Sequence, residues 1–319
     1  MRKILLLFLL ISSFLSCNNA KDNQVNVSTI PVNFEFERFD KAFYTSSEKG
    51  LKKLKEKYPI LFPKQVHDSV WIHKINNKDE QELFAETQKI FNDDEFLQEQ
   101  LISLFKHIKY YNKSFTSPKV ITMLSNIDYD NRVVYADSLL LISLDAYLGE
   151  KHLFYNDYPK YIKQNNHKGH IIVDVANSIV HQQIVPNSNR TFLEKIIFEG
   201  KKMYVLDLFL PQITDQEKIG YSLDKNTWIL ENEEQVWKYF IENKILFSTE
   251  TKLNKRFIEN GPFSKFYLSE DKNSPGKVGV WIGWQIVRSY MQNNDVSLQQ
   301  LLRNKGIEIF NKSKYKPRK

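Results

Sequence analysis

The stretch from Ile171 to Asp207 constrains the fold of this chain more than any other. It predicts two consecutive helices, IIVDVANSIVHQQI and RTFLEKIIFEGKKMYVLDLF, joined by a turn at residues 186–189. Pro186 cannot continue the first helix, and Ser188 or Asn189 has a side chain suited to cap the second. The second helix is apolar on nearly every side, which is typical of a buried helix. We therefore expect the rest of the chain to pack around this pair.

The first of these helices has one polar side and one apolar side. At ~100° per residue, the polar row consists of Asp174, Asn177, Ser178 and His181, and His170 joins it if the helix begins early enough. The opposite side consists of Ile172, Val175, Ala176, Ile179 and Val180. This pattern predicts a helix that buries its apolar face and presents a short polar row elsewhere.

Glu199 is the charged residue that lies on the apolar stripe of the second helix. An unpaired carboxylate in such a place is costly, so we expect Glu199 to be buried against a partner. The candidate partners are His181, on the preceding helix, and Arg288, which is embedded in another apolar segment.

The helix pair is similar in outline to the core of a helical zinc peptidase. In such a core, one helix bears HExxH, whose two histidines bind zinc and whose glutamate activates water, and a second helix supplies a third ligand. Here His181 and Glu199 stand at two of these positions, whereas Asn177 replaces the first histidine and Ser178 the catalytic glutamate. The sequence therefore predicts a degenerate zincin site that has no catalytic residue, metal or cofactor.

Two other interpretations of these polar residues stay open. The first is an ordinary core histidine hydrogen-bonded to a buried glutamate. The second is an active metallohydrolase with an atypical zinc site, which would draw ligands from His167, His170 or Asp174. Gly169 lies between the two histidines, which favours a surface or helix-start pair instead.

The chain begins MRKILLLFLLISSFLSC, which has the parts of a secretory signal. Two basic residues precede an apolar run that is too short to span a membrane, and Ser16 is the small residue before Cys17. This pattern predicts a lipoprotein signal over 1–16, with Cys17 acylated by palmitate, although an ordinary signal with an incidental cysteine is the alternative. Residues 17–29 are polar and lack periodicity, which predicts a flexible tether. A single domain is expected over 30–319.

Composition narrows the possible partners. Cys17 is the only cysteine among 319 residues, so we expect a mature protein without disulfides that is held together by its core. The formal net charge of +7 comes from basic residues that are interleaved with acids, and no basic, aromatic groove for nucleic acid is expected. The basic excess and the 16 tyrosines permit a protein that contacts lipid or peptidoglycan, which is a third class of function.

The remaining periodicity predicts a mostly helical α+β fold, a zincin-like helical domain with a three- to four-stranded antiparallel sheet. The strands are expected as a meander over 119–126, 132–135 and 139–144, to which the alternating start of 32–43 adds a strand. Amphipathic helices are expected over 47–58, 79–92, 94–111, 225–243 and 249–260. In the helix predicted over 278–291, Gly279 and Gly283 form a flat strip that another backbone can approach closely.

Several segments resemble the gliding-motility-associated lipoprotein GldB family. They are LISLDAYLG (141–149), RTFLEKIIFEGKKMYVLD (190–207), ENEEQVWKYFIEN (231–243), SPGKVGVWIGWQIVRSYM (274–291) and KSKYKP (312–317). The family is similar to predicted zinc-dependent peptidases, in which HExxH is followed by a helix with Glu-Gly and by a Gly-aromatic-x-x-Gly-aromatic stretch. Glu199-Gly200 and Gly279–Trp284 match the last two elements, whereas Asn177 and Ser178 depart from the first.

The resemblance implies a lipid-anchored protein of the cell envelope, outside the cytoplasm, that is needed for gliding. It also implies partners in the gliding machinery and in the associated type IX secretion system, and a membrane contact through the lipid anchor. Together with the degenerate site, it predicts a non-catalytic binding or assembly component and not an enzyme.

Overall fold

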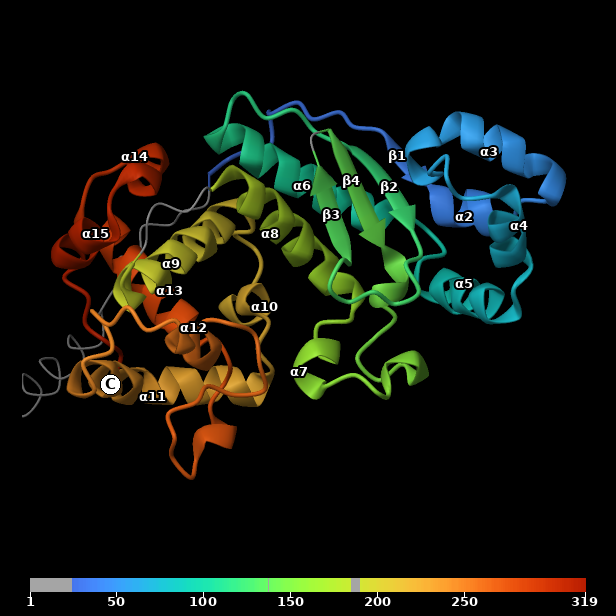
Figure 1. Cartoon of the computed structure of the whole chain (residues 1–319). Coiled ribbons are helices and arrows are strands. Elements are labelled where there is room, and N and C mark those ends of the chain that lie inside the picture. Colours follow the sequence, from blue (N-terminus) through green and yellow to red (C-terminus); the bar gives the residue numbers. More distant parts are fainter. Residues whose placement is uncertain (1–24, 137, 185–189) are drawn as a thin grey trace, which may run out of the picture.

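The computed structural model describes residues 25–136, 138–184 and 190–319 (Figure 1). The predicted signal peptide, Cys17, most of the predicted tether and the turn at 186–189 lie outside these residues. The main elements, in chain order, are β1 (Phe36–Arg38), α2 (Phe39–Tyr44), α3 (Leu51–Lys57), α4 (Asp68–Asn76), α5 (Lys78–Ile90), α6 (Glu95–Tyr111), β2 (Lys119–Met123), β3 (Val133–Ala136), β4 (Leu139–Ser143), α7 (Lys160–Lys163), α8 (Ile171–Gln183), α9 (Phe192–Phe209), α10 (Asp215–Ile219), α11 (Leu223–Glu242), α12 (Lys252–Phe257), α13 (Val278–Asn293), α14 (Leu298–Arg303) and α15 (Gly306–Ser313). The prediction of a mostly helical fold with a small sheet is confirmed.

The predicted helix pair exists as α8 and α9. The apolar face of α8 is buried as expected, and its polar row is half-buried or exposed. Helix α9 begins later than predicted, because its cap is Thr191 and not Ser188 or Asn189. The Thr191 side chain accepts a hydrogen bond from the Glu194 amide, and the Glu194 carboxylate accepts one from the Thr191 amide. This reciprocal pair satisfies two amide groups that the first turn would otherwise leave free.

The sheet differs from the predicted antiparallel meander. Its strand order is β1-β2-β4-β3, with β1 and β4 both parallel to β2 and with β3 antiparallel to β4. The additional N-terminal strand is confirmed as β1. The meander is wrong because β3 lies at the edge, half-exposed along its length, whereas the buried and more apolar β4 takes the place beside β2. Near-continuous apolar runs belong at the centre of a sheet, where both faces are covered.

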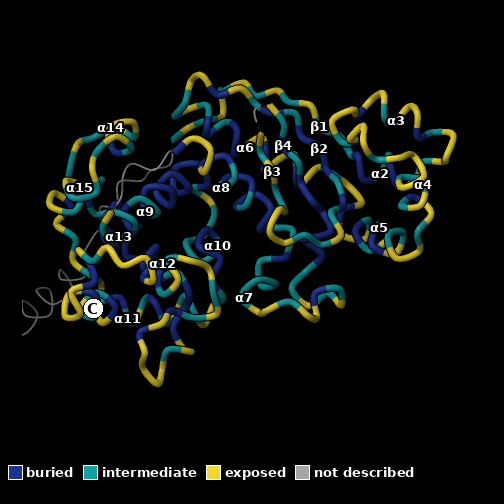
Figure 2. Tube along the Cα trace, in the orientation of Figure 1, coloured by how far each residue is buried: buried dark blue, intermediate teal, exposed yellow. Residues whose placement is uncertain are grey.

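Helices cover this sheet and extend from it in two directions. Helices α2–α5 lie at the end of the sheet near β1, and α9 and α11–α15 form the opposite end of the molecule (Figure 1). Helices α6 and α8 lie between these ends, and the burial colouring in Figure 2 shows α8 as a mostly buried segment. One hydrophobic cluster extends from Phe39 in α2 to Ile309 in α15.

The close contact of α9 with α13 depends on glycine. A Cβ atom on Gly283 would lie 1.8 Å from the Ile196 carbonyl oxygen, and one on Gly200 would lie 2.3 Å from the Gly283 backbone. The predicted glycine strip of α13 is therefore confirmed, and its partner backbone is that of α9. This crossing sets which side chains of the two helices come level with each other.

Candidate functional site

The degenerate zincin positions lie where α8 passes α9. Asn177 and Ser178 are half-buried and His181 is exposed. The side chain of Glu199 is 26 % exposed, and both of its carboxylate oxygens accept hydrogen bonds from Lys202 Nζ, at 2.9 and 3.1 Å. The prediction that Glu199 is buried against His181 or Arg288 is thus wrong, because the carboxylate is partly exposed and its hydrogen-bonded partner is Lys202. Lys202 lies one turn further along the same helix and reaches the carboxylate without any help from tertiary packing.

Arg288 instead pairs with Asp207 and Asp215. Its guanidinium donates two hydrogen bonds to Asp207, at 2.8 and 2.7 Å, and two to Asp215, at 2.6 and 2.7 Å. The helix crossing explains the difference. Because Gly283 lies beside Gly200, the following turns of α13 bring Arg288 level with the end of α9, beyond Glu199.

His181 lies close enough to Glu199 and Lys202 for both charges to affect its pKa. Although His181 is exposed as a residue, partial desolvation of its imidazole and the Lys202 ammonium lower its pKa, and Glu199 acts in the opposite direction. Lys277 also belongs to this polar region. Burial lowers the pKa of the Lys277 ammonium to about 8, although Asp174 and Glu199 favour its charged form. Lys277 Nζ donates a hydrogen bond to the Ile219 carbonyl at 2.6 Å.

A second polar cluster forms at the start of α8. The 3-10 turn Lys168–His170 leads directly into the helix and places His170 at its N-terminus. Glu217 Oε1 lies 2.7 Å from His170 Nδ1 and 3.3 Å from His167 Nε2. The two histidines therefore share the carboxylate of Glu217, which lies 47 residues after His170 and which no sequence motif placed beside them.

In this second cluster, His167 and Glu217 each stabilise the charged form of the other. Burial alone would raise the pKa of Glu217, but hydrogen bonds from His167 and His170 outweigh it and hold that pKa well below its usual range. The hydrogen bond to Glu217 also raises the pKa of His167. Glu217 is therefore an ionised carboxylate at neutral pH.

Asp174, one helical turn after His170, completes the arrangement. Its Oδ1 lies 3.6 Å from His170 Nε2. Its Oδ2 accepts a hydrogen bond from Tyr147 Oη at 2.7 Å and forms an ion pair with Arg132 Nη2 at 3.0 Å. These two partners fix the carboxylate beside the imidazole ring.

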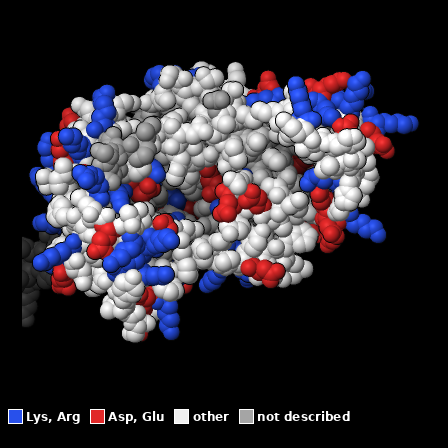
Figure 3. All heavy atoms as spheres, in the orientation of Figure 1, with Lys and Arg blue, Asp and Glu red and all other residues white. Residues whose placement is uncertain are grey.

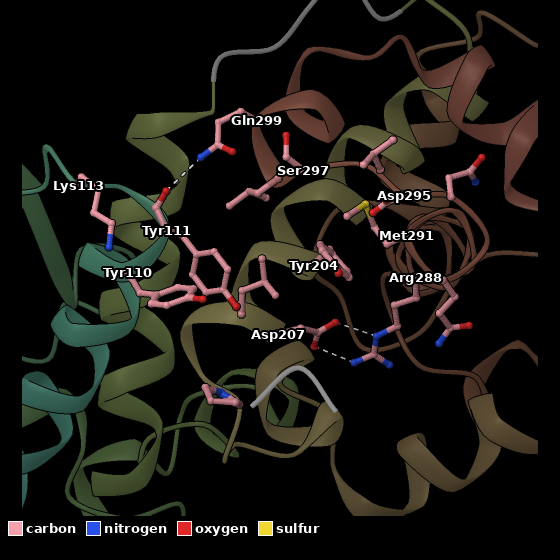
Figure 4. Close-up of a pocket in the computed structure, with 16 residues that line it drawn as sticks. Tyr110, Tyr111, Lys113, Tyr204, Asp207, Arg288, Met291, Asp295, Ser297 and Gln299 are labelled. Atoms are coloured by element: carbon pink, nitrogen blue, oxygen red, sulfur yellow. Dashed lines mark hydrogen bonds and ion pairs between the residues drawn. The ribbon is translucent and has the colours of Figure 1, made fainter. Parts of the chain in front are cut away.

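The Arg288–Asp207 pair also lines a large groove (Figure 4). Its volume is about 1080 Å³. The labelled side chains come from the end of α6 and the residues just after it, from α9, from α13, and from the start of α14 and the segment before it, and they surround a common space (Figure 4). They include Tyr110, Tyr111, Lys113, Tyr204, Met291 and Gln299. Gln299 Nε2 donates a hydrogen bond to the Tyr111 carbonyl at 3.1 Å and so joins the two walls.

Surface charge is distributed unevenly. On the face shown in Figure 3, Asp and Glu side chains gather beside a hollow near the middle, and Lys and Arg side chains are scattered toward both ends. A nucleic-acid groove is expected to show a continuous basic stripe, and the basic residues on this face do not merge into one (Figure 3).

None of the helices in the described part of the chain has the length and apolar character needed to cross a membrane.

Comparison with known proteins gives one match. The family model for gliding motility protein GldB matches residues 20–317. No curated protein and no solved structure matches the chain. The match includes α8, α9, α13 and both polar clusters, and with them every segment on which the resemblance rested. The chain therefore belongs to the GldB family of gliding motility lipoproteins.

Proposed function

We propose that this gliding motility protein is a non-catalytic binding or assembly component, held at a membrane of the cell envelope through lipid on Cys17. Its partners are proteins of the gliding machinery and the associated type IX secretion system. The observation that supports a non-catalytic role is the engagement of both Glu199 oxygens by Lys202. In a zincin, a carboxylate at this place faces the metal.

The residues of α8 support the same proposal. Ser178 stands where a zincin has the glutamate that activates water, and a serine hydroxyl is far too weak a base for that task at neutral pH. Asn177 stands where the first histidine ligand would be. The polar row of α8 then serves to solvate one side of the helix and to contact neighbouring groups.

The groove in Figure 4 is the surface that we assign to partner binding. Tyrosine side chains combine a large apolar ring with a polar tip and are enriched at protein interfaces. Tyr110 is 38 % exposed and packs edge-on against Tyr111, with ring centroids 4.9 Å apart. Lys113 Nζ lies 5.2 Å from the centroid of the Tyr110 ring. A partner segment that enters the groove meets these aromatic and cationic groups first.

A matched pair of tyrosine variants tests this assignment. Tyr110→Ala should impair gliding without lowering the melting temperature, because a half-exposed ring contributes little to the core. Tyr129→Ala is the control, since Tyr129 is 37 % exposed and packs edge-on against another tyrosine, Tyr158, outside the groove. Equal gliding by the two variants would remove the groove from the proposal.

The non-catalytic role has its own test. Ser178→Ala should support normal gliding, because the serine has no catalytic role to lose. The alternative is a metallopeptidase-like hydrolase with an atypical zinc site, which is favoured by the proximity of His167, His170 and Glu217. Cleavage of peptides by the purified protein, abolished by a chelator, would establish that alternative and refute the non-catalytic role.

A further inference from the structure

Three side chains that commonly bind metals converge beside the start of α8. His167, His170 and Glu217 each offer one ligand atom, and these atoms all lie within 4.8 Å of one another. We propose that they form a binding site for one zinc-class divalent cation. This inference concerns a place distinct from the degenerate zincin positions on α8 and α9, and it stands whether or not the proposed function is correct.

The distances suit a small cation with short bonds. Zinc binds nitrogen and oxygen at about 2.0–2.1 Å in tetrahedral geometry, which separates neighbouring ligand atoms by about 3.4 Å. His167 Nε2 lies 3.3 Å from Glu217 Oε1 and His170 Nδ1 lies 2.7 Å from the same oxygen. Both separations are close to the tetrahedral spacing, and the two imidazole nitrogens lie within 4.8 Å of each other.

The backbone holds the two histidines in place before any metal arrives. An isolated β-bridge pairs His167 with Leu148, and the Gly149 amide donates a hydrogen bond to the Asn166 carbonyl at 2.7 Å. His170 is buried at the first turn of α8. Gly169 has no side chain to crowd the neighbouring ring, since a Cβ there would lie 3.3 Å from His167 Nδ1.

Helix α10 is held just as firmly, and it fixes Glu217. Its cap Thr214 accepts a hydrogen bond from the Glu217 amide at 3.2 Å, and Gly220 ends the helix in the left-handed conformation. Asp215 binds Arg288 of α13, and Lys218 Nζ donates to Asp207 of α9 at 2.9 Å. Ligands on such a fixed frame lose little conformational freedom on binding a metal.

Asp174 supplies the outer interaction that ligating histidines usually have. An imidazole that binds metal through one nitrogen generally donates its other N–H to a carboxylate or carbonyl. His170 Nδ1 faces Glu217, and its Nε2 lies 3.6 Å from Asp174 Oδ1, which is an ion-pair contact slightly longer than a hydrogen bond. Arg132 and Tyr147 hold that carboxylate in position. Asp174 therefore orients a ligand in this site and is not itself a ligand.

The donor set defines the class of cation. Two imidazoles and one carboxylate suit zinc, cobalt or nickel, whereas calcium and magnesium prefer a shell of oxygens. Three protein ligands leave the fourth position of a tetrahedral ion to water or to a group from a partner. The His167 side chain is 39 % exposed, which gives the ion a path from solvent. A bound cation would join the start of α8 to α10, and through Asp215 to α13.

Metal titration of the full-length protein, purified in detergent without a histidine tag and dialysed against a chelator, tests the site. Cobalt(II) should bind at one equivalent with the intense visible bands of tetrahedral coordination, and zinc should displace it. Zinc should also raise the melting temperature, since it binds the folded state. Magnesium and calcium should do neither. A protein that binds no cobalt or zinc under these conditions overturns the proposal.

Variants assign the ligands. His167→Ala and Glu217→Gln should each weaken zinc binding at least tenfold while the protein stays folded, because both side chains are partly exposed. Asp174→Asn should keep the stoichiometry and weaken zinc binding about 10–100-fold. The control is His152→Ala, which removes another histidine that faces a glutamate, Glu86, at 3.5 Å. Wild-type affinity in both His167→Ala and Glu217→Gln would show that any bound metal lies elsewhere.

Discussion

Arg288 of α13 donates two hydrogen bonds to Asp207 of α9, from Nε to Oδ2 at 2.8 Å and from Nη2 to Oδ1 at 2.7 Å. Asp207 also accepts hydrogen bonds from Lys218 Nζ and from Trp284 Nε1. Its side chain is only 9 % exposed. One buried carboxylate thus satisfies an arginine, a lysine and an indole, and it links α9, α10 and α13.

Removing this carboxylate should destabilise the fold strongly. Asp207→Ala leaves the Lys218 ammonium and part of the Arg288 guanidinium buried without their counter-charge, and breaking one side of such a pair costs roughly 3–5 kcal/mol. The measurement is the free energy of unfolding in urea. The control is Glu199→Ala, which breaks a partly exposed pair between Glu199 and Lys202 and should cost about 0–1 kcal/mol. Equal losses in the two variants would contradict this ranking.

The crossing of α9 and α13 should tolerate no side chain at Gly283. Gly283→Ala places a Cβ 1.8 Å from the Ile196 carbonyl oxygen, so the helices must separate. The expected loss is about 3 kcal/mol or more, because backbone atoms cannot move aside as a flexible side chain can. Gly261→Ala is the matched control, since its nearest neighbour atom would be 3.9 Å away. Thermal unfolding of both variants decides the point, and a Gly283→Ala protein as stable as wild type would show that the crossing is loose.

Asp145 should give the stability a specific pH dependence. Burial raises its pKa to about 6, although hydrogen bonds from the Ile127 and Ser125 amides favour the charged form. Because the folded state then binds a proton more tightly than the unfolded state, this group adds stability as the pH falls from about 6 toward 4. The difference in unfolding free energy between wild type and Asp145→Asn should therefore grow by about 1 kcal/mol in favour of wild type from pH 7 to pH 5. A constant difference would show that Asp145 titrates normally.

Cys17 should attach the protein to the membrane. Cys17→Ser should leave the unprocessed precursor, because the serine cannot accept the lipid that precedes removal of residues 1–16. Detergent partitioning and the apparent mass of the variant provide the measurement. A Cys17→Ser protein that is still cleaved and still fractionates with membranes would exclude the lipoprotein signal.

Local periodicity determined much of the fold. The apolar face of α8, the burial of α9 and the glycine strip of α13 follow from the spacing of side chains along one element, because a helix repeats its geometry every few residues. The family segments are likewise short and contiguous, each covering part of one main element and the residues beside it. The lipoprotein signal remains a prediction from sequence, because Cys17 lies outside the described residues.

Only the tertiary structure decided which strands pair and which charges meet. The meander expected over 119–126, 132–135 and 139–144 pairs each strand with the next one in the chain. In the structure β4 instead lies between β2 and β3, because the more apolar strand takes the covered position. Strand order depends on burial on both faces, which the spacing of one strand does not specify.

The partners of the polar residues show the same limit most clearly. Glu199 and Asp207 both lie in the apolar helix α9. The way α13 crosses α9 brings Arg288 beside Asp207, so these two form an ion pair, whereas Glu199 pairs with Lys202 of its own helix. Glu217 reaches His167 and His170 only because α10 folds back across the start of α8. Sequence spacing determines which face of an element a residue occupies, whereas the packing of distant elements determines what that residue meets there.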